Sequence, residues 1–465
     1  MLQFMDFVQQ AFFSVTNWNR DNSYGSLNAT TRGTRVFQHI WHSIDSSLAL
    51  LDFSTPTGLS LALSSLASPN FATSYSFDSL GALRGNVSYL FSSRPLHIVH
   101  RSHDTPLRLL VPGYRQIEEL RDPDIIWKEE ESIRGSRTSR RDTLIYGRLF
   151  LPRSHLEALY LRRLSPTTQL KISAVSSSQL RSGGSILFLL SQDRAKYSTE
   201  YLYSTDTALL GVRGLYNFGP DLREKPVDTE NQHIPVSTSY KPKGRFSAGA
   251  ELYYGILNKS GGMSTGFRFA TLPQHTGFPY TMTLTVNPLM GNLTSTYAVK
   301  AGSDLTLCSK FDFNVYSYES GFQLGMELWE RKNGVPEQVD LSWAYEKLLR
   351  PGVSGWGEPP IINRNLPLKA LENNTLANTE GALSASNIKQ SKVVSIGSLS
   401  HETYNGVDDA NTAGVLKARV NQDGEVGLLW EGRLKELLYT FGVHIDFQRR
   451  DQIFRGVGLQ IQYSS

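Results

Sequence analysis

Strict alternation of apolar and polar side chains is the feature that most restricts how this chain can fold. Apolar residues alternate with threonines and other polar residues over 280–286, 293–299, 305–315 and 322–328. A period of two places the apolar side chains on one face of a strand, whereas a helix needs a period near 3.6. Turn-forming residues interrupt the pattern about every 10–12 residues, so we predict consecutive antiparallel hairpins.

Segments with this pattern number about nineteen, give or take two, and most are close to the roughly 9–11 residues of a tilted membrane strand. The last is GVGLQIQYSS, residues 456–465, in which Val457, Leu459, Ile461 and Tyr463 share one side. A terminal strand leaves unpaired N–H and C=O groups unless another strand covers them. We therefore expect the last strand to pair with the first. An odd number of strands would make that closing pair parallel.

Two architectures alternate in this way: a soluble β-sandwich, whose apolar face is its core, and a membrane β-barrel, whose apolar face meets lipid. The polar face here is rich in Gly, Ser, Thr, Asn and Gln, as a crowded lumen would be. Nearly twenty strands also exceed what an open sheet usually holds. Aromatic residues recur near strand ends on the apolar face, as at membrane interfaces: Tyr280, Tyr297, Phe322, Tyr439, Phe447 and Tyr463. The sequence thus predicts an all-β fold, a transmembrane β-barrel of about nineteen strands.

The assignment of faces can be tested at two neighbouring residues. Val443 belongs to the apolar side of its strand and Gly442 to the polar side. Arginine at 443 is expected to destabilise the protein by about 2–4 kcal/mol if Val443 meets the middle of the membrane. Gly442→Ser is expected to be milder.

The amino-acid composition argues against several other classes of protein. The chain has 465 residues, 19% of them charged, and a formal net charge of +4; this surplus is too small and too scattered to indicate nucleic-acid binding. Its one cysteine, Cys308, cannot form an internal disulfide, which suits a reducing or cytosol-facing compartment. No stretch approaches the roughly 18 apolar residues of a membrane-spanning helix, so a helical membrane protein is excluded.

All of 1–465 is predicted to form a single barrel domain. Residues 1–18 carry apolar side chains at helical spacing, with Asp6 and no basic residue before Arg20. This predicts an amphipathic helix packed on the body of the protein rather than a secretory signal or a mitochondrial presequence. Three stretches break the strand pattern and are predicted to be long loops: 101–143, 219–243 and 333–411.

Motifs that resemble catalytic or metal sites have plainer explanations. GMSTG, residues 262–266, matches the G-x-S-x-G nucleophile elbow, but that elbow joins a strand to a helix and both flanks here are strand-like. We therefore interpret it as a hairpin turn. Five histidines fall in irregular segments without a cysteine or carboxylate framework for zinc: His39, His42, His97, His100 and His103. We expect no catalytic activity, no metal and no cofactor.

Several stretches resemble one family, the fungal mitochondrial distribution and morphology protein 10. They include NSYGSLNATTR (22–32), YGRLFLPRSHLEALYLRRLSPTTQ (146–169), TLTVNPLMGNLTSTYAVKAG (283–302), CSKFDFNVYSYES (308–320) and LLWEGR (428–433), with MLQFMDFVQQAF at the start and the C-terminal strand. The resemblance extends over most of the chain and is most specific at 283–332. It implies a mitochondrial outer-membrane barrel of the porin and import-channel type, with about nineteen strands and the N-terminal helix in or near the lumen.

The same resemblance implies two scaffold roles. The family anchors the ER–mitochondria encounter structure, whose lipid-transfer subunits bridge the two membranes, and it joins the sorting and assembly machinery that inserts β-barrels into the outer membrane. The implied partners are subunits of both assemblies and membrane lipids, with no nucleic acid. The alternative function is a solute- or protein-conducting pore, because about nineteen strands enclose a wide lumen. Lys300, Lys310, Asp312 and Glu327 would line that lumen.

The resemblance also implies a targeting signal in the last strand, with the order polar, any, Gly, any, any, apolar, any, apolar. Gly458, Ile461 and Tyr463 fill three of its slots, and Gly456 departs from the polar slot. A second departure is the segment of residues 33–50, which looks like an insertion relative to the family.

Partner binding is predicted on the apolar face. Tyr89 and Phe91 in NVSYLF, with Phe311 and Phe313 in KFDFNVY, are hypothesised to form flat docking ridges. Aromatic side chains provide large contact areas at low entropic cost. The competing interpretation is that these four side chains simply face lipid. The family pattern favours docking.

Overall fold

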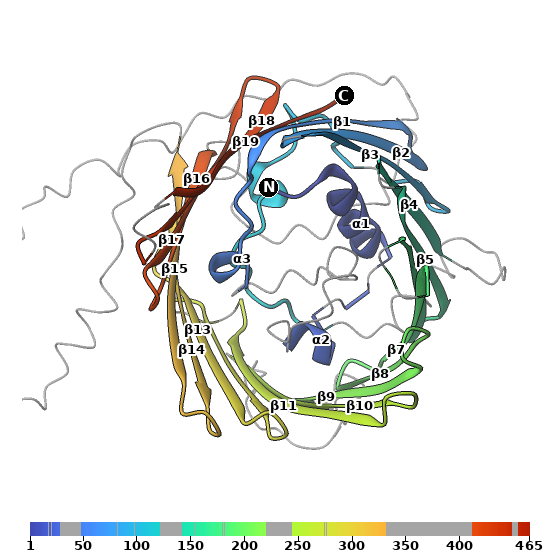
Figure 1. The fold of residues 1–465 in the computed structure, drawn as a ribbon, viewed down its shortest axis with the longest axis vertical. Helices are drawn as coiled ribbons and strands as arrows, with labels where there is room; N and C mark the ends of the chain where they lie inside the picture. The colour runs from blue at the N-terminus through green and yellow to red at the C-terminus, as the bar shows by residue number, and fades with distance from the viewer. Residues whose placement is uncertain are drawn as a thin grey trace, which may run out of the picture. The chain divides into compact units, whose positions relative to one another are not determined.

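The computed structural model describes residues 1–27, 48–120, 142–219, 244–331, 412–448 and 454–465, apart from isolated positions within these ranges. The described chain forms one closed sheet of nineteen strands with four helices (Figure 1). The strands are β1 (Gly58–Ser68), β2 (Phe71–Leu80), β3 (Ala82–Ser92), β4 (Thr143–Leu151), β5 (His155–Ser165), β6 (Thr168–Ser176), β7 (Gly184–Asp193), β8 (Tyr197–Ser204), β9 (Leu209–Phe218), β10 (Gly244–Gly255), β11 (Ser260–Thr271), β12 (Tyr280–Asn287), β13 (Asn292–Lys300), β14 (Leu305–Asn314), β15 (Ser320–Arg331), β16 (Thr412–Asn421), β17 (Glu425–Leu434), β18 (Leu437–Asp446) and β19 (Phe454–Ser464). The helices are α1 (Phe4–Val15), α2 (Tyr24–Leu27), α3 (Leu48–Leu51) and α4 (Leu107–Leu110).

The closing seam of the barrel lies between β1 and β19, which run parallel. Seven residue pairs are in register along it, from Gly58 opposite Gly458 to Ser64 opposite Ser464. Consecutive strands pair antiparallel around the rest of the wall. The predicted pairing of the last strand with the first, and its parallel direction, are confirmed. The closed sheet leaves no strand edge exposed, as a wall in lipid requires.

The two faces of the wall separate apolar from polar side chains, as the alternation predicts. On β1, Leu59, Leu61 and Leu63 point outward and are between 39% and 52% exposed. On β16, Leu416 is exposed on the outer face, whereas its neighbour Lys417 is fully buried on the inner one. An apolar outer face is expected of a barrel in lipid, whereas a sandwich would bury that face. The predicted barrel is therefore confirmed.

Val443→Arg is expected to lower the free energy of unfolding by about 2–4 kcal/mol, because the charge would face the apolar surroundings of the outer wall. Val443 has the outward parity of Phe441, which is exposed. The measurement is the urea midpoint of the protein in lipid vesicles. His444→Arg is the matched control, because the next residue along β18 faces the lumen. Equal losses of stability in the two variants would contradict this assignment of faces.

The surroundings of Gly442 favour a larger effect of Gly442→Ser than the mild one expected from its face alone. Gly442 lies on the inner face, as predicted, but the chain that enters β1 crosses directly over it. A Cβ atom at 442 would lie 2.6 Å from Cδ of Pro56 and 3.2 Å from Cδ1 of Leu429. Contacts below about 3.0 Å force a neighbour to move, and the proline ring has little freedom to do so.

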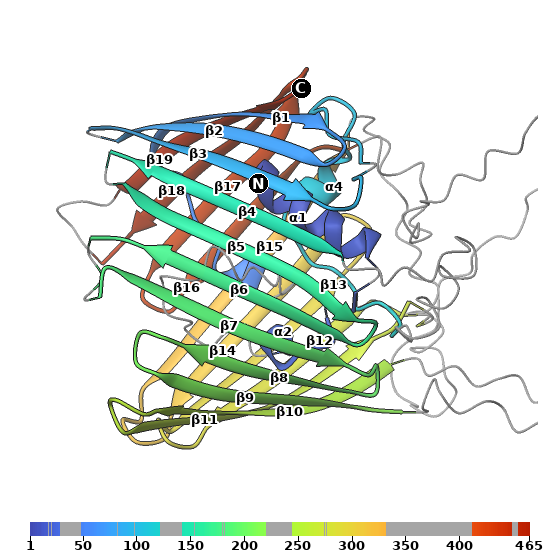
Figure 2. The same cartoon turned by 90° about the vertical axis from the view of Figure 1, so that its right-hand side faces the viewer.

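The two ends of the barrel differ in their connections (Figure 2). β3, β9 and β15 all end at the same rim, and each is followed by one of the predicted long loops. At the opposite rim neighbouring strands are joined by short turns, such as residues 256–259 and 288–291. We refer to these ends as the long-loop rim and the short-turn rim. Much of 101–143 is described, whereas 219–243, apart from Gly219, and 333–411 lie outside the described residues.

The described residues before β1 lie against the inner wall. α1 contacts β2 and β3, α2 contacts β9 to β11, and α3 contacts β14 to β16 (Figure 1). Met5, Val8 and Phe12 recur at helical spacing on the buried side of α1. The helix ends where the Thr16 hydroxyl donates a hydrogen bond to the Phe12 carbonyl over 2.9 Å. The predicted N-terminal helix in the lumen is confirmed. Across the described residues, no helix is both long enough and apolar enough to cross a membrane.

The seat of α1 is an apolar patch on the inner wall. Here the inward side chains are as hydrophobic as the outward ones, so the polar inner face expected from the alternation is interrupted. Burying the apolar side of α1 on this patch removes both surfaces from the water of the lumen. The patch consists of Ala72, Leu90, Leu144, Tyr146, Leu159, Leu161 and Val175.

Candidate functional site

The first predicted docking ridge lies on β3. Tyr89 and Phe91 both point outward and are 47% and 45% exposed. Phe71 on β2 pairs with Phe91 across the strands and stacks on Tyr89, with the ring centroids 6.0 Å apart. β3 ends at Ser92, so this ridge stands at the long-loop rim. The structure thus brings these two predicted residues together on one exposed surface.

The second predicted ridge lies on β14. Phe311 is 43% exposed and pairs with Phe322 of β15, and Phe313 is half-buried beside Leu293 of β13. β14 reaches the short-turn rim at Asn314, so this ridge stands at the end opposite the first. Ten strands, β4 to β13, separate the two ridges in one direction around the barrel. The four predicted residues therefore form two separate surfaces rather than one.

The predicted targeting residues all lie on the closing strand, β19. Ile461 and Tyr463 are opposite Leu61 and Leu63 of β1 and have their outward parity. Gly458 faces the lumen, where a Cβ atom would lie 2.7 Å from the backbone nitrogen of Thr57 and closer still to the carbonyl of Pro56. The glycine of the signal is thus the place where the entering chain touches the wall.

The GMSTG motif lies within β11, so its interpretation as a hairpin turn is wrong; the turn is at 256–259. Ser264 is buried and its hydroxyl shares a 2.9 Å hydrogen bond with the phenol of Tyr24 in α2. Burial raises the pKa of Tyr24 to about 12, so the phenol remains neutral. Gly266 faces Leu27 of α2, and any side chain there would overlap it. The motif forms the seat of α2 and is not a nucleophile elbow.

The segment predicted as an insertion also contributes to the lumen where it is described. Leu50, at the end of that segment, and the next residue Leu51 are both in α3 and are buried against Ala298 and Cys308 of the inner wall. Gly325 of β15 allows this approach, because a Cβ atom there would lie 2.7 Å from the Leu50 carbonyl oxygen. Residues 33–47 lie outside the described residues.

Residues 98–118, which we call the strap, follow the inner wall along the long-loop rim from β19 to β10. Near the start, the Ser102 N–H donates to the Ser464 carbonyl over 3.1 Å. Further on, the Tyr114 N–H donates to Glu327 of β15, and Arg245 of β10 donates to the Glu118 carbonyl over 3.0 Å. This part of the predicted loop 101–143 is therefore attached to strands far apart in the sequence.

The strap and α1 pack against each other. The Leu2 N–H donates to the Leu110 carbonyl over 2.8 Å, and Leu107, Leu110 and Val111 join the apolar cluster around Phe12. Together these two segments line the inner wall at the long-loop rim and narrow the lumen there.

A buried ion network joins the wall, the strap and the N-terminus. Lys417 and Glu431, on neighbouring strands, are both fully buried, with Nζ 2.9 Å from Oε2. The Lys417 ammonium also donates to the Pro112 carbonyl of the strap over 2.6 Å, and the α-amino group of Met1 contacts Oε1 of Glu431. Burial and the nearby Lys417 hold the pKa of that amino group well below its usual value. Glu327 lies beside this network, whereas Lys310 and Asp312 form a separate 2.9 Å ion pair in the lumen.

The histidines do not assemble a metal site in the described part of the chain. His100 contacts the Ile98 carbonyl and His103 contacts Asp104, and no group of three potential metal ligands occurs among the residues described. His39, His42 and His97 lie outside the described residues.

Comparisons with known proteins agree over the full length of the chain. The family model described as mitochondrial distribution and morphology protein 10 matches residues 1–465. Proteins of that name are 53% identical over 467 residues in Phaeosphaeria nodorum, 49% identical over 465 residues in Sclerotinia sclerotiorum and 40% identical over 488 residues in Podospora anserina. In each case the alignment covers 100% of this chain and 100% of the relative.

Proposed function

The chain belongs to the mitochondrial distribution and morphology protein 10 family, and on that premise we propose that it is a scaffold of the mitochondrial outer membrane. It anchors the ER–mitochondria encounter structure and also joins the sorting and assembly machinery that inserts β-barrels into the same membrane. Its partners are subunits of these two assemblies and the surrounding lipids. It has no catalytic role.

The observation that carries this proposal is that the outer wall presents exposed aromatic side chains, whereas the inner wall holds α1 and the strap. α1 and the strap occupy the lumen at one rim and are held by buried hydrogen bonds and ion pairs. These attached segments narrow the lumen, which favours a scaffold over the alternative of a conducting pore. The wall, in contrast, presents Tyr89, Phe91 and Phe311 as exposed aromatic side chains, the residue types that dominate protein interfaces.

The separation of the two ridges also supports a scaffold with two assemblies. One ridge is at the long-loop rim on β3 and the other at the short-turn rim on β14. Two surfaces that do not overlap allow each assembly its own contact with the barrel.

The direct test is affinity purification of the tagged protein from mildly solubilised mitochondria. The expected result is recovery of both the barrel-assembly core and ER-anchored lipid-transfer proteins. Recovery of the barrel alone, together with steady conductance of the purified protein in planar bilayers, would support the pore instead.

Replacing both Phe311 and Phe313 with alanine is expected to lower recovery of one of the two assemblies by about tenfold, because aromatic anchors are typical interface hot spots. Recovery of the other assembly should remain, since the β3 ridge is untouched. The measurement is quantitative mass spectrometry of the purified complexes.

The matched control for this prediction is another exposed aromatic pair, Phe188 on β7 and Tyr203 on β8, whose rings stack with centroids 6.2 Å apart. Alanine at both should leave both assemblies intact. If the Phe311 and Phe313 variant fails to insert into membranes, or if the control lowers recovery equally, the aromatic side chains act only as part of the lipid-facing wall.

A further inference from the structure

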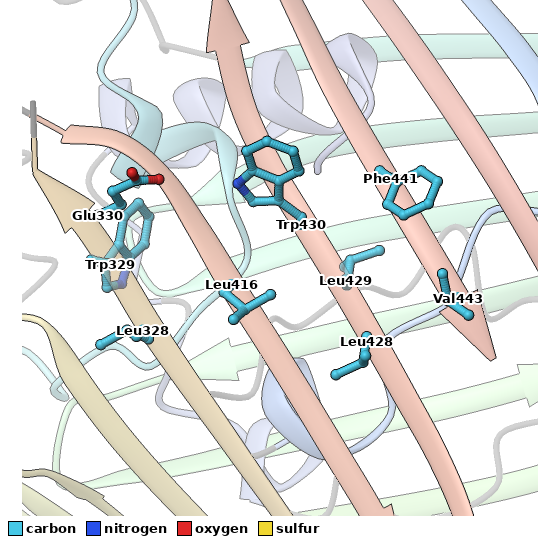
Figure 3. A pocket seen from close by; sticks show the side chains of 9 residues that line it. All are labelled: Leu328, Trp329, Glu330, Leu416, Leu428, Leu429, Trp430, Phe441 and Val443. Carbon is cyan, nitrogen blue, oxygen red and sulfur yellow. The ribbon is translucent and has the colours of Figure 1, made fainter. Parts of the chain in front are cut away.

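The outer wall from β15 to β18 carries a groove of about 580 Å³ near the long-loop rim (Figure 3). Its sides are outward apolar side chains from four neighbouring strands, and its rim end is occupied by Glu330. Figure 3 shows these side chains spread along the strands away from the Glu330 carboxylate. The apolar residues that matter here are Leu328, Leu416, Leu428, Phe441 and Val443.

Glu330 is unusual because it is an acidic residue on the outer face. It is exposed and shares the outward parity of Leu328. By the alternation of their strands, the other acidic residues on the described strands face the lumen. Among the described residues, none forms a hydrogen bond or an ion pair with the Glu330 side chain. Glu330 is the last but one residue of β15, so its carboxylate stands at the rim.

Two glycines extend the site sideways from Glu330. In register across the strands, Glu330 is opposite Gly414, Gly414 is opposite Gly432, and Gly432 is opposite Tyr439. This row of four residues therefore has side chains only at its two ends. The space above the glycines is occupied by aromatic rings instead.

The aromatic rings form a corner over this row. Trp430 and Tyr439 meet edge to face, with centroids 5.1 Å apart and planes at 76°. A Cβ atom at Gly414 would lie 3.3 Å from Nε1 of Trp430, which shows that the indole leans toward the strand next to Glu330. Figure 3 shows the indole nitrogen on the side of Trp430 that faces Glu330.

The geometry points to a binding site for one phosphatidylcholine molecule on this part of the wall. The choline ammonium lies on the outer face of the Trp430 indole, beside the Glu330 carboxylate, and one acyl chain follows the groove toward Val443. The inference rests on the proposed placement of the barrel in a membrane, but it is independent of both scaffold roles.

Three properties of the site select this lipid. The carboxylate attracts the ammonium of a zwitterionic headgroup and repels an anionic headgroup. Tryptophan and tyrosine rings recognise quaternary ammonium groups, and tryptophan is the best of them. Polarity also changes along the groove as it does along one lipid molecule: Val443 is the fourth residue after Tyr439 along β18, which is roughly 13 Å of strand away from the rim.

The test is native mass spectrometry of the full-length protein with an equimolar mixture of phosphatidylcholine, phosphatidylethanolamine and phosphatidylglycerol of identical acyl chains. We expect one phosphatidylcholine to be retained roughly tenfold over either competitor. Trp430→Leu keeps the groove apolar but removes the strongest cation–π partner, and Glu330→Gln removes the charge. Each variant should abolish the preference.

Tyr201→Leu, at an exposed aromatic of β8, is the matched control and should retain the preference. Equal retention of the three lipids by the unaltered protein, a preference for the ethanolamine or glycerol headgroup, or an unchanged preference in Trp430→Leu would overturn the site. Flotation of each variant with phosphatidylcholine vesicles is measured in parallel. If the unaltered protein does not float, the membrane placement itself is wrong, and the site is overturned with it.

Discussion

Gly458→Val is expected to prevent closure of the barrel. Gly458 is opposite Gly58 in the first registered pair of the parallel seam. Its inner side is covered by the backbone of Pro56 and Thr57, with Thr57 N only 2.7 Å from where a Cβ would stand. Gly58 has φ +73°, so the entering chain reaches β1 through a bend that L side chains rarely adopt. Valine would have to displace this backbone, which has no rotamer to change, and the seam would be lost.

The experiment is refolding from urea into lipid vesicles, with the protease-resistant fraction as the measure of closed barrel. Refolding does not depend on a targeting signal, so it isolates the role of Gly458 in closure. Gly456→Ala is the matched control: it lies on the same face, and the nearest atom to its Cβ is the side-chain Cγ2 of Thr57 at 3.0 Å, which a change of the χ1 rotamer can move. Normal refolding of Gly458→Val, combined with failed import in cells, would mean that the glycine acts through the targeting signal alone.

The wall of the barrel could be predicted from the sequence because a strand's period is local. The alternation within each segment shows which side chains share a face. Whether the number of strands is odd or even then determines whether the closing pair is parallel. The ridges show the limit of this reasoning. Tyr89 and Phe91 are near each other in sequence, and so are Phe311 and Phe313, so each pair could be placed on one surface. The distance between the two pairs depends on every strand between them, so it could not be predicted from the sequence.

The contents of the lumen could not be predicted, because they depend on contacts between distant segments. From its sequence the strap is predicted to be an irregular polar loop. In the structure, however, its backbone forms hydrogen bonds with Ser464, Glu327 and Arg245. One signal was available for the seat of α1. In residues 144–151 and 156–164 leucines and other apolar residues occur at both parities, which indicates that the inner face of these strands is also covered by apolar side chains.

Glycines were informative only after the path of the N-terminal segment was known. Gly266, Gly325 and Gly458 all face the lumen, and each is touched by a different part of that segment: α2, α3 and the Pro56 carbonyl. In the sequence they are indistinguishable from glycines that face lipid or form turns. GMSTG was misinterpreted as a turn for this reason.

Glu431→Gln is expected to lower the free energy of unfolding by about 3–5 kcal/mol, the usual effect of breaking a buried ion pair from one side. Lys417 is fully buried, so without the Glu431 carboxylate its ammonium stays in the interior beside the α-amino group of Met1. The urea midpoint in vesicles measures the loss. The double variant Lys417→Met with Glu431→Gln should recover part of it, because both charges are removed together.

Lys310→Met provides the comparison that separates burial from charge. Lys310 forms an ion pair of the same 2.9 Å length with Asp312, but their side chains are 19% and 38% exposed, so the expected loss is at most about 1 kcal/mol. Equal losses at the two pairs, or no recovery in the double variant, would show that the cost at Glu431 does not arise from an unpaired buried charge.

Lys417 also donates a hydrogen bond to the Pro112 carbonyl of the strap. Glu431→Gln alone leaves that contact in place, whereas Lys417→Met removes it. Protease cleavage within the strap should therefore increase in every variant that carries Lys417→Met, including the double variant that regains stability.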